Sequence, residues 1–556
     1  MGTREPVVIR SEIDGIPTFS IDGPRPFTAI LSFRVGTYDE RFPIRGITHL
    51  TEHLALYPRR TTEISYNGDV GSHLTDFWAQ GHPDQVGDYL RGVCQSLHDL
   101  PFDRLDVEAD VLQREWHSAT HSFIDSILWS YFGPFGPGLS GTYEAGLGWL
   151  GPEEIRQWAS RYFTRGNAAL TIVGKPPESF GIELPEGPPL PFFAPPRTQP
   201  APAKPTLFDI GEQHGVTWGT LIKQRRNADE PAFYIASETL AARLRDRLRH
   251  DLGRTYWVQN GWHRIDADLV GAWHGFSADP SQSREVALEH QQVVDEFISN
   301  GPTRDELARY VRTRVSRYED HPDDTARAFL SDLAEAHLNG WEPMASLGWW
   351  ISQCEALTPD DVRDRFAEAY RQSYTIADLP PGELEPPPGV PVRARPMAGV
   401  QFESKLRYRK NQPLAVRIGP DGIDLESSRG WTPSPLGEIA MISFRGSDMS
   451  LDATTGTMWI DTSRYVRSRS FWLEHLPSRP TSQLVLVAAL LLAVAYSQFW
   501  SLVVAGTMVW GLARIRREPD PGEIRDRSLT IEGSVRKYMP EEAILPPPRA
   551  DGADGG

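Results

Sequence analysis

Two histidines and a glutamate occur within five residues of the chain, as His49-Leu50-Thr51-Glu52-His53. On an α-helix His49 and His53 project from one face, one turn apart, so that both imidazoles can bind the same metal ion. Glu52 directly precedes the second histidine, where its carboxylate can reach a water molecule on that metal. The order H-x-x-E-H is the inverse of the commoner zinc motif H-E-x-x-H. The pattern predicts a catalytic metal site on one helix.

A third protein ligand is expected, because catalytic zinc sites use three protein ligands and leave one position for water. Glu108 and Glu115 lie seven residues apart, two helical turns, and therefore share one face of a helix. One of them can bind the metal while the other orients a ligand. A solvated acidic helix face is the alternative for a glutamate pair taken alone. The histidine motif upstream favours the metal site.

The elements that must position these residues follow from the hydrophobic pattern. A strand is predicted at Phe27–Val35, the motif helix at about Gly46–Tyr57, and a further strand at Gly71–Ala79. Helices and a closing strand follow at Pro83–Leu97, Asp103–His121, Pro152–Phe163 and Ala168–Val173. A second segment repeats this style, with a helix at Glu230–Asp251, strands at Thr255–Trp262 and Leu269–Ser277, and helices continuing to Tyr370. Strands followed by blocks of helices predict an α+β fold.

Two proline-rich stretches divide the 556 residues, which are too many for one domain. The third segment shows short β patterns at Leu414–Ile418, Gly422–Leu425, Ile439–Phe444 and Thr457–Asp461, with a closing helix near Ser470–Leu476. The predicted order is a zinc-binding domain (1–175), a linker (176–205), a second domain (206–378), a linker (379–403), a small β domain (404–480), a membrane segment (484–513) and a disordered tail (518–556).

The charge balance and the cysteines limit the class of protein. A net charge of −17 argues against a nucleic-acid-binding protein, which needs a basic face. Cys94 and Cys354 are the only cysteines, so a disulfide framework is excluded. The first residues contain no apolar stretch, and no secretory signal is expected.

A membrane segment is predicted near the C-terminal end. Leu484–Ala513 contains no charged residue, whereas Arg514, Arg516 and Arg517 follow directly. One tilted span and a hairpin are both open, because Ser497-Gln498 interrupts the run. The arginines favour a cytoplasmic tail, and the expected absence of a signal favours cytoplasmic peptidase domains at the cell membrane.

The segment Gly46–Leu54 resembles the active-site helix of the insulinase/pitrilysin metallopeptidases, the inverzincins that include mitochondrial processing peptidase and its bacterial relatives. The resemblance covers about residues 10–378 and implies two homologous α/β-layer domains of this peptidase type. It implies zinc bound by His49, His53 and Glu115, with Glu108 as the upstream acid and Glu52 as the base.

Further positions match the family in order along the chain. Asn67, Thr75 and Phe77 match a strand pattern that binds substrate backbone by β-augmentation. Arg249 and Tyr256 match a pair that reaches the substrate beside the zinc and stabilises the oxyanion or holds the peptide. The segment after residue 404 resembles a pleckstrin-homology-like domain.

The resemblance implies a membrane-tethered zinc endopeptidase that cleaves peptides or small unfolded proteins in an enclosed chamber. Relatives build this chamber from four homologous domains, and this chain is expected to hold two of them. A homodimer, or a heterodimer with a related subunit, would complete it. The alternative is a non-catalytic structural or peptide-binding member of the same family.

Overall fold

The computed structural model describes residues 7–461 with gaps at 24–25, 60, 62, 119–122, 134, 143, 149, 193–204, 209–214, 228–229, 321, 378–397, 399, 404–414, 420, 428–429, 436–438, 446–447 and 454–455. The chain forms two compact units. The first contains both halves of the expected peptidase, and the second contains the strands of the small β domain.

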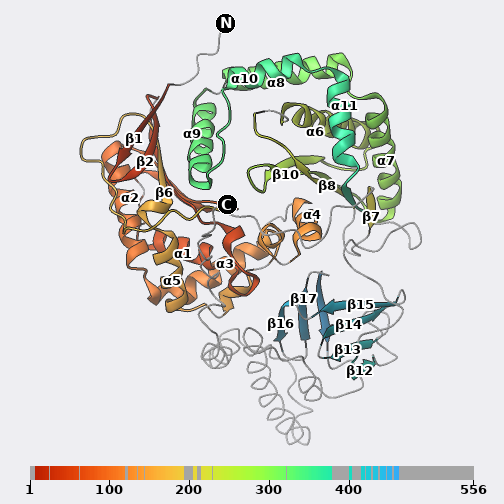
Figure 1. Cartoon of the computed structure of the whole chain (residues 1–556), viewed down its shortest axis with the longest axis horizontal. Helices are drawn as coiled ribbons and strands as arrows, with labels where there is room; N and C mark the ends of the chain where they lie inside the picture. Colours follow the sequence, from red (N-terminus) through yellow and green to blue (C-terminus); the bar gives the residue numbers. More distant parts are fainter. Residues whose placement is uncertain are drawn as a thin grey trace, which may run out of the picture. The chain divides into compact units, whose positions relative to one another are not determined.

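The first half is a six-stranded sheet with helices packed on it (Figure 1). Its strand order is β1-β2-β6-β3-β5-β4, and all neighbours are antiparallel except β2 and β6. The strands are β1 (Val8–Ile13), β2 (Ile16–Ile21), β3 (Phe27–Phe33), β4 (Ser65–Val70), β5 (Thr75–Gly81) and β6 (Ala168–Val173). The helices are α1 (Ile47–Leu56), α2 (Pro83–His98), α3 (Leu105–Ser118), α4 (Phe123–Phe132) and α5 (Pro152–Tyr162).

The second half repeats this topology. The order β7-β11-β8-β10-β9 of its sheet corresponds strand by strand to β2-β6-β3-β5-β4, including the parallel first pair. Its strands are β7 (Thr206–Phe208), β8 (Gly215–Lys223), β9 (Gln259–Arg264), β10 (Leu269–Ser277) and β11 (Ser373–Ala377). Its helices are α6 (Glu230–Arg245, continued by a π-helical turn at Asp246–Asp251), α7 (Ser283–Asn300), α8 (Arg304–Asp320), α9 (Pro322–Asn339), α10 (Leu347–Ala356) and α11 (Pro359–Tyr370). The predicted α+β fold with two domains of the same type is confirmed at the level of topology.

Each half places one helix on the sheet of the other half. Helix α4 of the first half packs on β8 and β10, and helix α9 of the second half packs on β2, β3 and β6 (Figure 1). Glycines permit the close approach of α4: a Cβ atom at Gly219 would lie 2.8 Å from the Ile127 side chain. Ile127 and Leu128 are fully buried in this contact, as is Leu330 of α9 in the reciprocal one. The two halves therefore share their hydrophobic cores.

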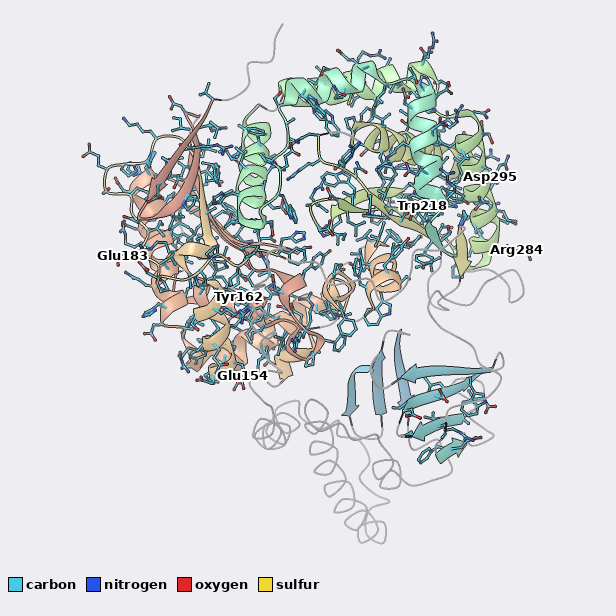
Figure 2. All side chains as sticks on the ribbon, viewed as in Figure 1. Glu154, Tyr162, Glu183, Trp218, Arg284 and Asp295 are labelled. Carbon is cyan, nitrogen blue, oxygen red and sulfur yellow. The ribbon has the colours of Figure 1, made fainter. Side chains whose placement is uncertain are left out.

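The side chains follow this layering (Figure 2). Tyr162 and Trp218 lie inside the cores of the two halves, whereas Glu183, Arg284 and Asp295 are exposed to solvent. Burying large aromatic side chains of this kind contributes a major share of the hydrophobic stabilisation of a domain.

The expected linker 176–205 begins as a packed strap, which comprises Lys175–Phe192. Four apolar side chains of the strap are buried, namely Phe180, Ile182, Leu184 and Phe192. Its backbone is also bound to the first half: Ile182 N–H donates to Asp14, and Leu190 N–H donates to the Asn167 side chain. The strap is extended, as proline-rich sequence predicts, but it is part of the first half.

The second unit contains two antiparallel sheets in its described part. One has the order β12-β13-β14-β15 and the other β16-β17-β18. The strands are β12 (Val400–Glu403), β13 (Ala415–Gly419), β14 (Gly422–Ser427), β15 (Gly430–Pro435), β16 (Ile439–Arg445), β17 (Asp448–Ala453) and β18 (Gly456–Asp461). The four strands predicted from sequence are confirmed, while β12, β15 and β17 were missed. The expected helix at Ser470–Leu476, the membrane segment 484–513 and the tail 518–556 lie outside the described residues. Within the described residues, no helix has the length and apolar character needed to cross a bilayer.

The packing of α4 predicts that Ile127→Ala destabilises both halves together. The substitution leaves a cavity between α4 and the second sheet, and we expect the free energy of unfolding to fall by about 2–4 kcal/mol. Leu288→Ala is the matched control, because Leu288 is 54% exposed on α7, and its effect should stay within about 0.5 kcal/mol. Urea unfolding of the full chain measures both. Equal effects of the two substitutions would contradict the proposed packing role of α4.

Candidate metal site

Helix α1 is fixed at its start by a buried carboxylate. Glu40 accepts hydrogen bonds from Gly46 N–H and Thr48 N–H, both at 3.0 Å, and forms a 2.7 Å ion pair with Arg45. The carboxylate thus satisfies two of the free N–H groups at the helix N-terminus and interacts favourably with the helix dipole. Gly46 has a φ of 98°, a backbone conformation that favours glycine. These contacts set where the first turn of α1 begins.

The two faces of α1 have different roles. Leu50 and Leu54, four residues apart, are fully buried and hold one face in the core. The histidines occupy another face, where the His49 and His53 rings lie 5.0 Å apart, nearly perpendicular to each other. The predicted helical placement of the motif is confirmed.

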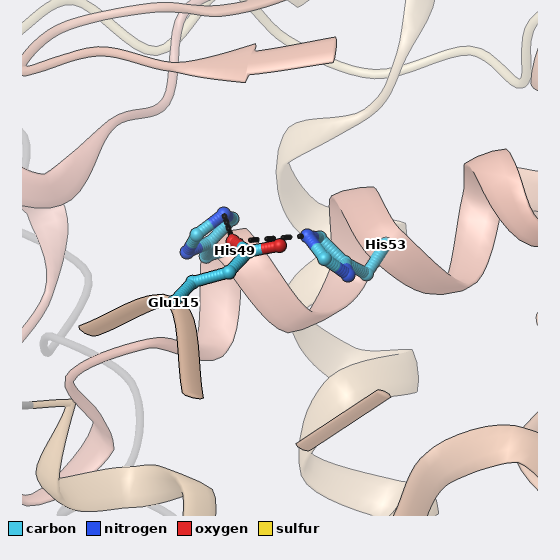
Figure 3. Close-up of side chains that lie close together, drawn as sticks. All are labelled: His49, His53 and Glu115. Atoms are coloured by element: carbon cyan, nitrogen blue, oxygen red, sulfur yellow. Dashed lines mark ion pairs between the residues drawn. The ribbon is translucent and has the colours of Figure 1, made fainter. Parts of the chain in front are cut away.

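Glu115 on α3 completes a cluster with these two rings (Figure 3). Its Oε2 atom lies 3.9 Å from His49 Nε2 and 3.8 Å from His53 Nε2. One ligand atom from each residue lies within 4.8 Å of the other two. Ligands of a tetrahedral zinc ion are separated by about 3.3 Å, given metal–ligand bonds of about 2.0–2.1 Å. The Glu115 side chain is 52% exposed and can make the small adjustment that is needed, so the donor set fits zinc.

The Nδ1 atom of each histidine faces a carboxylate of its own. Glu144 lies 2.9 Å from His49 Nδ1, and Glu108 lies 3.3 Å from His53 Nδ1. Both carboxylates are buried. A carboxylate at Nδ1 keeps the proton on that nitrogen and leaves the Nε2 lone pair free for a metal. Glu108 therefore occupies the orienting position predicted for it.

Glu144 is a site residue that sequence reasoning missed. It lies in a loop 29 residues after Glu115, and no motif marks it. Burial raises the pKa of Glu144, but the hydrogen bond and the charge attraction from His49 outweigh burial and hold this pKa below its usual value. The ionised carboxylate in turn raises the pKa of His49, although burial acts in the opposite direction.

Glu52 has the environment of a proton acceptor that works near neutral pH. Its side chain is about 5% exposed, and its carboxylate lies 3.8 Å from His53 Nε2. Burial raises the pKa of Glu52 to about 7, and the neighbouring carboxylates add to this effect while His49 opposes it. A base is most effective when its pKa lies close to the working pH.

The predicted substrate-binding residues separate into two groups. Asn67 lies on β4 and its side chain is exposed, as an interaction with substrate requires. Thr75 and Phe77 lie on the next strand, β5, and are fully buried. The Thr75 hydroxyl donates to Val35 O, and Phe77 packs on Phe33. Both side chains are thus buried within the first half, and their assignment to substrate binding stays a prediction.

Arg249 and Tyr256 lie together in the second half. The Arg249 guanidinium lies 5.1 Å from the centre of the Tyr256 ring, and Tyr256 is 74% exposed. The ion pairs given for Glu115 join it to the two histidines, whereas the guanidinium–ring contact given for Arg249 joins it to Tyr256. The role of this pair at the metal site therefore stays a prediction.

No protein-family model and no curated protein sequence matches the chain. Solved structures do match. An inactive M16 peptidase domain from Pseudomonas fluorescens has a TM-score of 0.55 at 15% identity, over 66% of this chain and 97% of that chain. A protease from Helicobacter pylori has a TM-score of 0.55 at 14% identity, over 67% and 99%. The first half of the periplasmic protease PqqL from Escherichia coli has a TM-score of 0.51 at 13% identity, over 66% and 91%.

These likenesses show the fold. The first unit has the fold of M16 peptidase domains. Identities of 13–15% establish no activity, and one of the similar structures is an inactive domain.

The raised pKa of Glu52 predicts how the metal-free protein responds to pH. Between pH 4.5 and 7 the folded protein holds a proton on Glu52 that the unfolded chain has lost, so stability falls as pH rises through this window. Glu52→Gln removes the ionisable group and with it this loss of stability. We therefore expect the substitution to be more stabilising at pH 8 than at pH 4.5, by about 2–4 kcal/mol in the free energy of unfolding. Urea titrations in chelator test this. A stabilisation that is independent of pH would show that Glu52 ionises normally.

The contact between Glu144 and His49 predicts weaker metal binding in Glu144→Ala. Without the carboxylate the imidazole can rotate and change tautomer, so we expect zinc affinity to fall about 10–100-fold. Competition with a fluorescent zinc chelator measures this directly. Glu153→Ala is the control, since Glu153 is 67% exposed on α5, and it should bind zinc as the wild type does. Unchanged affinity of Glu144→Ala would contradict the orienting role.

Proposed function

We propose that this chain is a zinc-dependent endopeptidase of the M16 type. The observation that carries the proposal is the convergence of His49 Nε2, His53 Nε2 and Glu115 Oε2 on one point, with the Glu52 carboxylate beside them. Two histidines and one glutamate are among the ligand sets of catalytic zinc sites, which leave the fourth position for water. The M16 fold, in which zinc peptidases occur, supports the assignment.

The mechanism divides between the metal and the residues of the chain. A zinc ion held by His49, His53 and Glu115 would activate water and polarise the scissile carbonyl. Glu52 accepts the proton of the attacking water and then donates it to the leaving amine. Glu108 and Glu144 hold the histidine rings in the required orientation.

Substrate is expected to bind as an extended strand on β4. Among the described residues this strand is the last of its sheet, and the exposed Asn67 side chain lies on it. Peptides that add to a sheet edge gain affinity through backbone hydrogen bonds with little dependence on sequence. Such binding suits peptides and small unfolded proteins.

A second subunit would complete the site. The described unit is similar in fold to half of PqqL, so a closed chamber requires a further pair of domains. We propose a dimer, either of this chain or with a related subunit, in which Arg249 and Tyr256 of one copy reach the metal site of the other. In that position they would stabilise the oxyanion or hold the peptide backbone.

Membrane attachment through 484–513 is a further part of the proposal. The charge-free sequence and the arginines after it support an anchor with a cytoplasmic C-terminal tail. Peptidase domains on the same side require that this segment is a hairpin or a re-entrant segment, and we propose this topology. Protease protection in right-side-out vesicles tests this orientation. Digestion of the N-terminal domains from outside would reverse it.

A non-catalytic, peptide-binding member of the family is the second candidate, favoured by the likeness to an inactive M16 domain. The two candidates differ in zinc content and in turnover. The presence of the complete set His49, His53, Glu115 and Glu52 favours the enzyme.

The proposed function predicts different results for two substitutions. Glu52→Gln should retain stoichiometric zinc but lose peptide hydrolysis by at least about 100-fold, because the base is absent. Glu115→Ala should lose both zinc and hydrolysis. Mass spectrometry of a peptide-library digest and elemental analysis of the purified protein measure the two properties. Full turnover by Glu52→Gln, or full zinc content in Glu115→Ala, would refute the corresponding role.

A further inference from the structure

Strand β4 covers the Glu52 side chain, and a glycine lies at the point of contact. A Cβ atom added to Gly68 would lie 2.7 Å from Glu52 Cδ and 2.8 Å from Cγ, and it would approach Oε1 more closely still. Real Cβ atoms essentially never approach another atom within 3.0 Å. The end of the Glu52 side chain therefore occupies the space that any side chain at position 68 would need.

Backbone conformation does not explain this glycine. Gly68 is not among the described glycines with positive φ, so an L-residue can adopt its backbone geometry. It is buried within an otherwise ordinary antiparallel strand, where glycine weakens the sheet and needs a local reason. The remaining reason is the space that it leaves for Glu52.

The strand is held more firmly than the side chain beneath it. Gly68 pairs with Phe77 of β5, and Phe77 is fully buried among Phe33 and Phe163. The Glu52 side chain, by contrast, can change rotamer, at a cost that its burial raises. A Cβ atom at position 68 would therefore displace the Glu52 carboxylate and leave β4 in place.

We propose that Gly68 is a positioning residue for Glu52. Because Gly68 has no side chain, the Glu52 carboxylate can lie under β4, beside His53. Gly68 thereby determines the position of the base relative to the metal ligands. Because β4 pairs only with β5 in the described part of the chain, its other edge is the one proposed to bind substrate. One strand thus sets the distance between the base and the peptide. This inference rests on the proposed function, in which Glu52 is the base.

The first test enlarges residue 68 and shortens residue 52, separately and together. Gly68→Ala is expected to lower kcat about 10–100-fold, with KM and zinc content little changed, because a small displacement of a catalytic group has this cost. Glu52→Asp shortens the carboxylate by one methylene and makes room for the added methyl group. Gly68→Ala introduced into Glu52→Asp should therefore lower kcat by less than about threefold. Equal fold-losses in the two backgrounds overturn the proposal.

Gly71→Ala is the control for loss of a glycine in the same hairpin. A Cβ atom there would meet Leu74 O alone, at 3.3 Å, and Gly71 has no positive φ. Its kcat should equal that of the wild type. A loss as large as that of Gly68→Ala would show a general effect on the hairpin and overturn the assignment.

The second test needs neither zinc nor activity. In metal-free protein, Gly68→Ala should lower Tm by about 2 °C or more, whereas in the Glu52→Ala background it should cause no loss. Equal losses of Tm in both backgrounds overturn the steric link. If the wild-type chain cleaves no peptide, the proposed function fails, while this measurement still decides whether Gly68 positions the Glu52 side chain.

Discussion

The reciprocal packing of α4 and α9 is the interaction on which the first unit depends. Each half supplies the helix that covers part of the other half's sheet. Apolar surface that would face solvent in an isolated half is buried only when both halves are present, since hydrophobic burial is the main favourable term in folding. The two halves are therefore joined as one unit, although their sheets have separate and matching strand orders.

Within the first unit, the candidate metal site lies where strand β4 of the first sheet contacts helix α1. The buried leucines and the hydrogen bonds to Glu40 hold helix α1 in place. The orientation of its histidine-bearing face is therefore fixed by the packing of its leucine-bearing face in the core. Strand β4, which pairs only with β5 in the described part of the chain, contacts the same helix. An extended peptide on the other edge of this strand would be next to the two histidines and Glu52. In the proposed function, this arrangement would combine a rigid site with a binding mode that depends on the peptide backbone more than on its side chains.

The sequence predicted the cluster of His49, His53 and Glu115 because its information is local. Helical spacing places His49 and His53 together, and the two-turn separation of Glu108 and Glu115 puts both on the face of α3 that meets the histidines. Glu144 could not be predicted, because a loop brings it to His49 through tertiary packing alone. Its residue type is common and its position along the chain is unconstrained.

The errors in the fold have similar causes. Helix α4 was missed because it is apolar on most sides, as a helix buried between two halves must be, and so lacks the expected periodicity. A separate point concerns Thr75 and Phe77, which the family resemblance assigned to substrate binding. Alternation along β5 places both on the covered face of the sheet, and the hairpin turn between β4 and β5 was not foreseen.

The packed strap has a consequence for where the first half can be cut. A boundary drawn after the last strand, near residue 175, would remove Phe180, Ile182, Leu184 and Phe192 from the apolar surface that they cover. It would also deprive Arg34 and Asn167 of their bonds to the backbone of Leu190 and leave buried polar groups unsatisfied. A fragment intended to carry the histidine motif must extend at least through Phe192. Proline-rich composition suggests a linker at which the chain could be cut. Here it belongs to a segment that the fold of the first half requires.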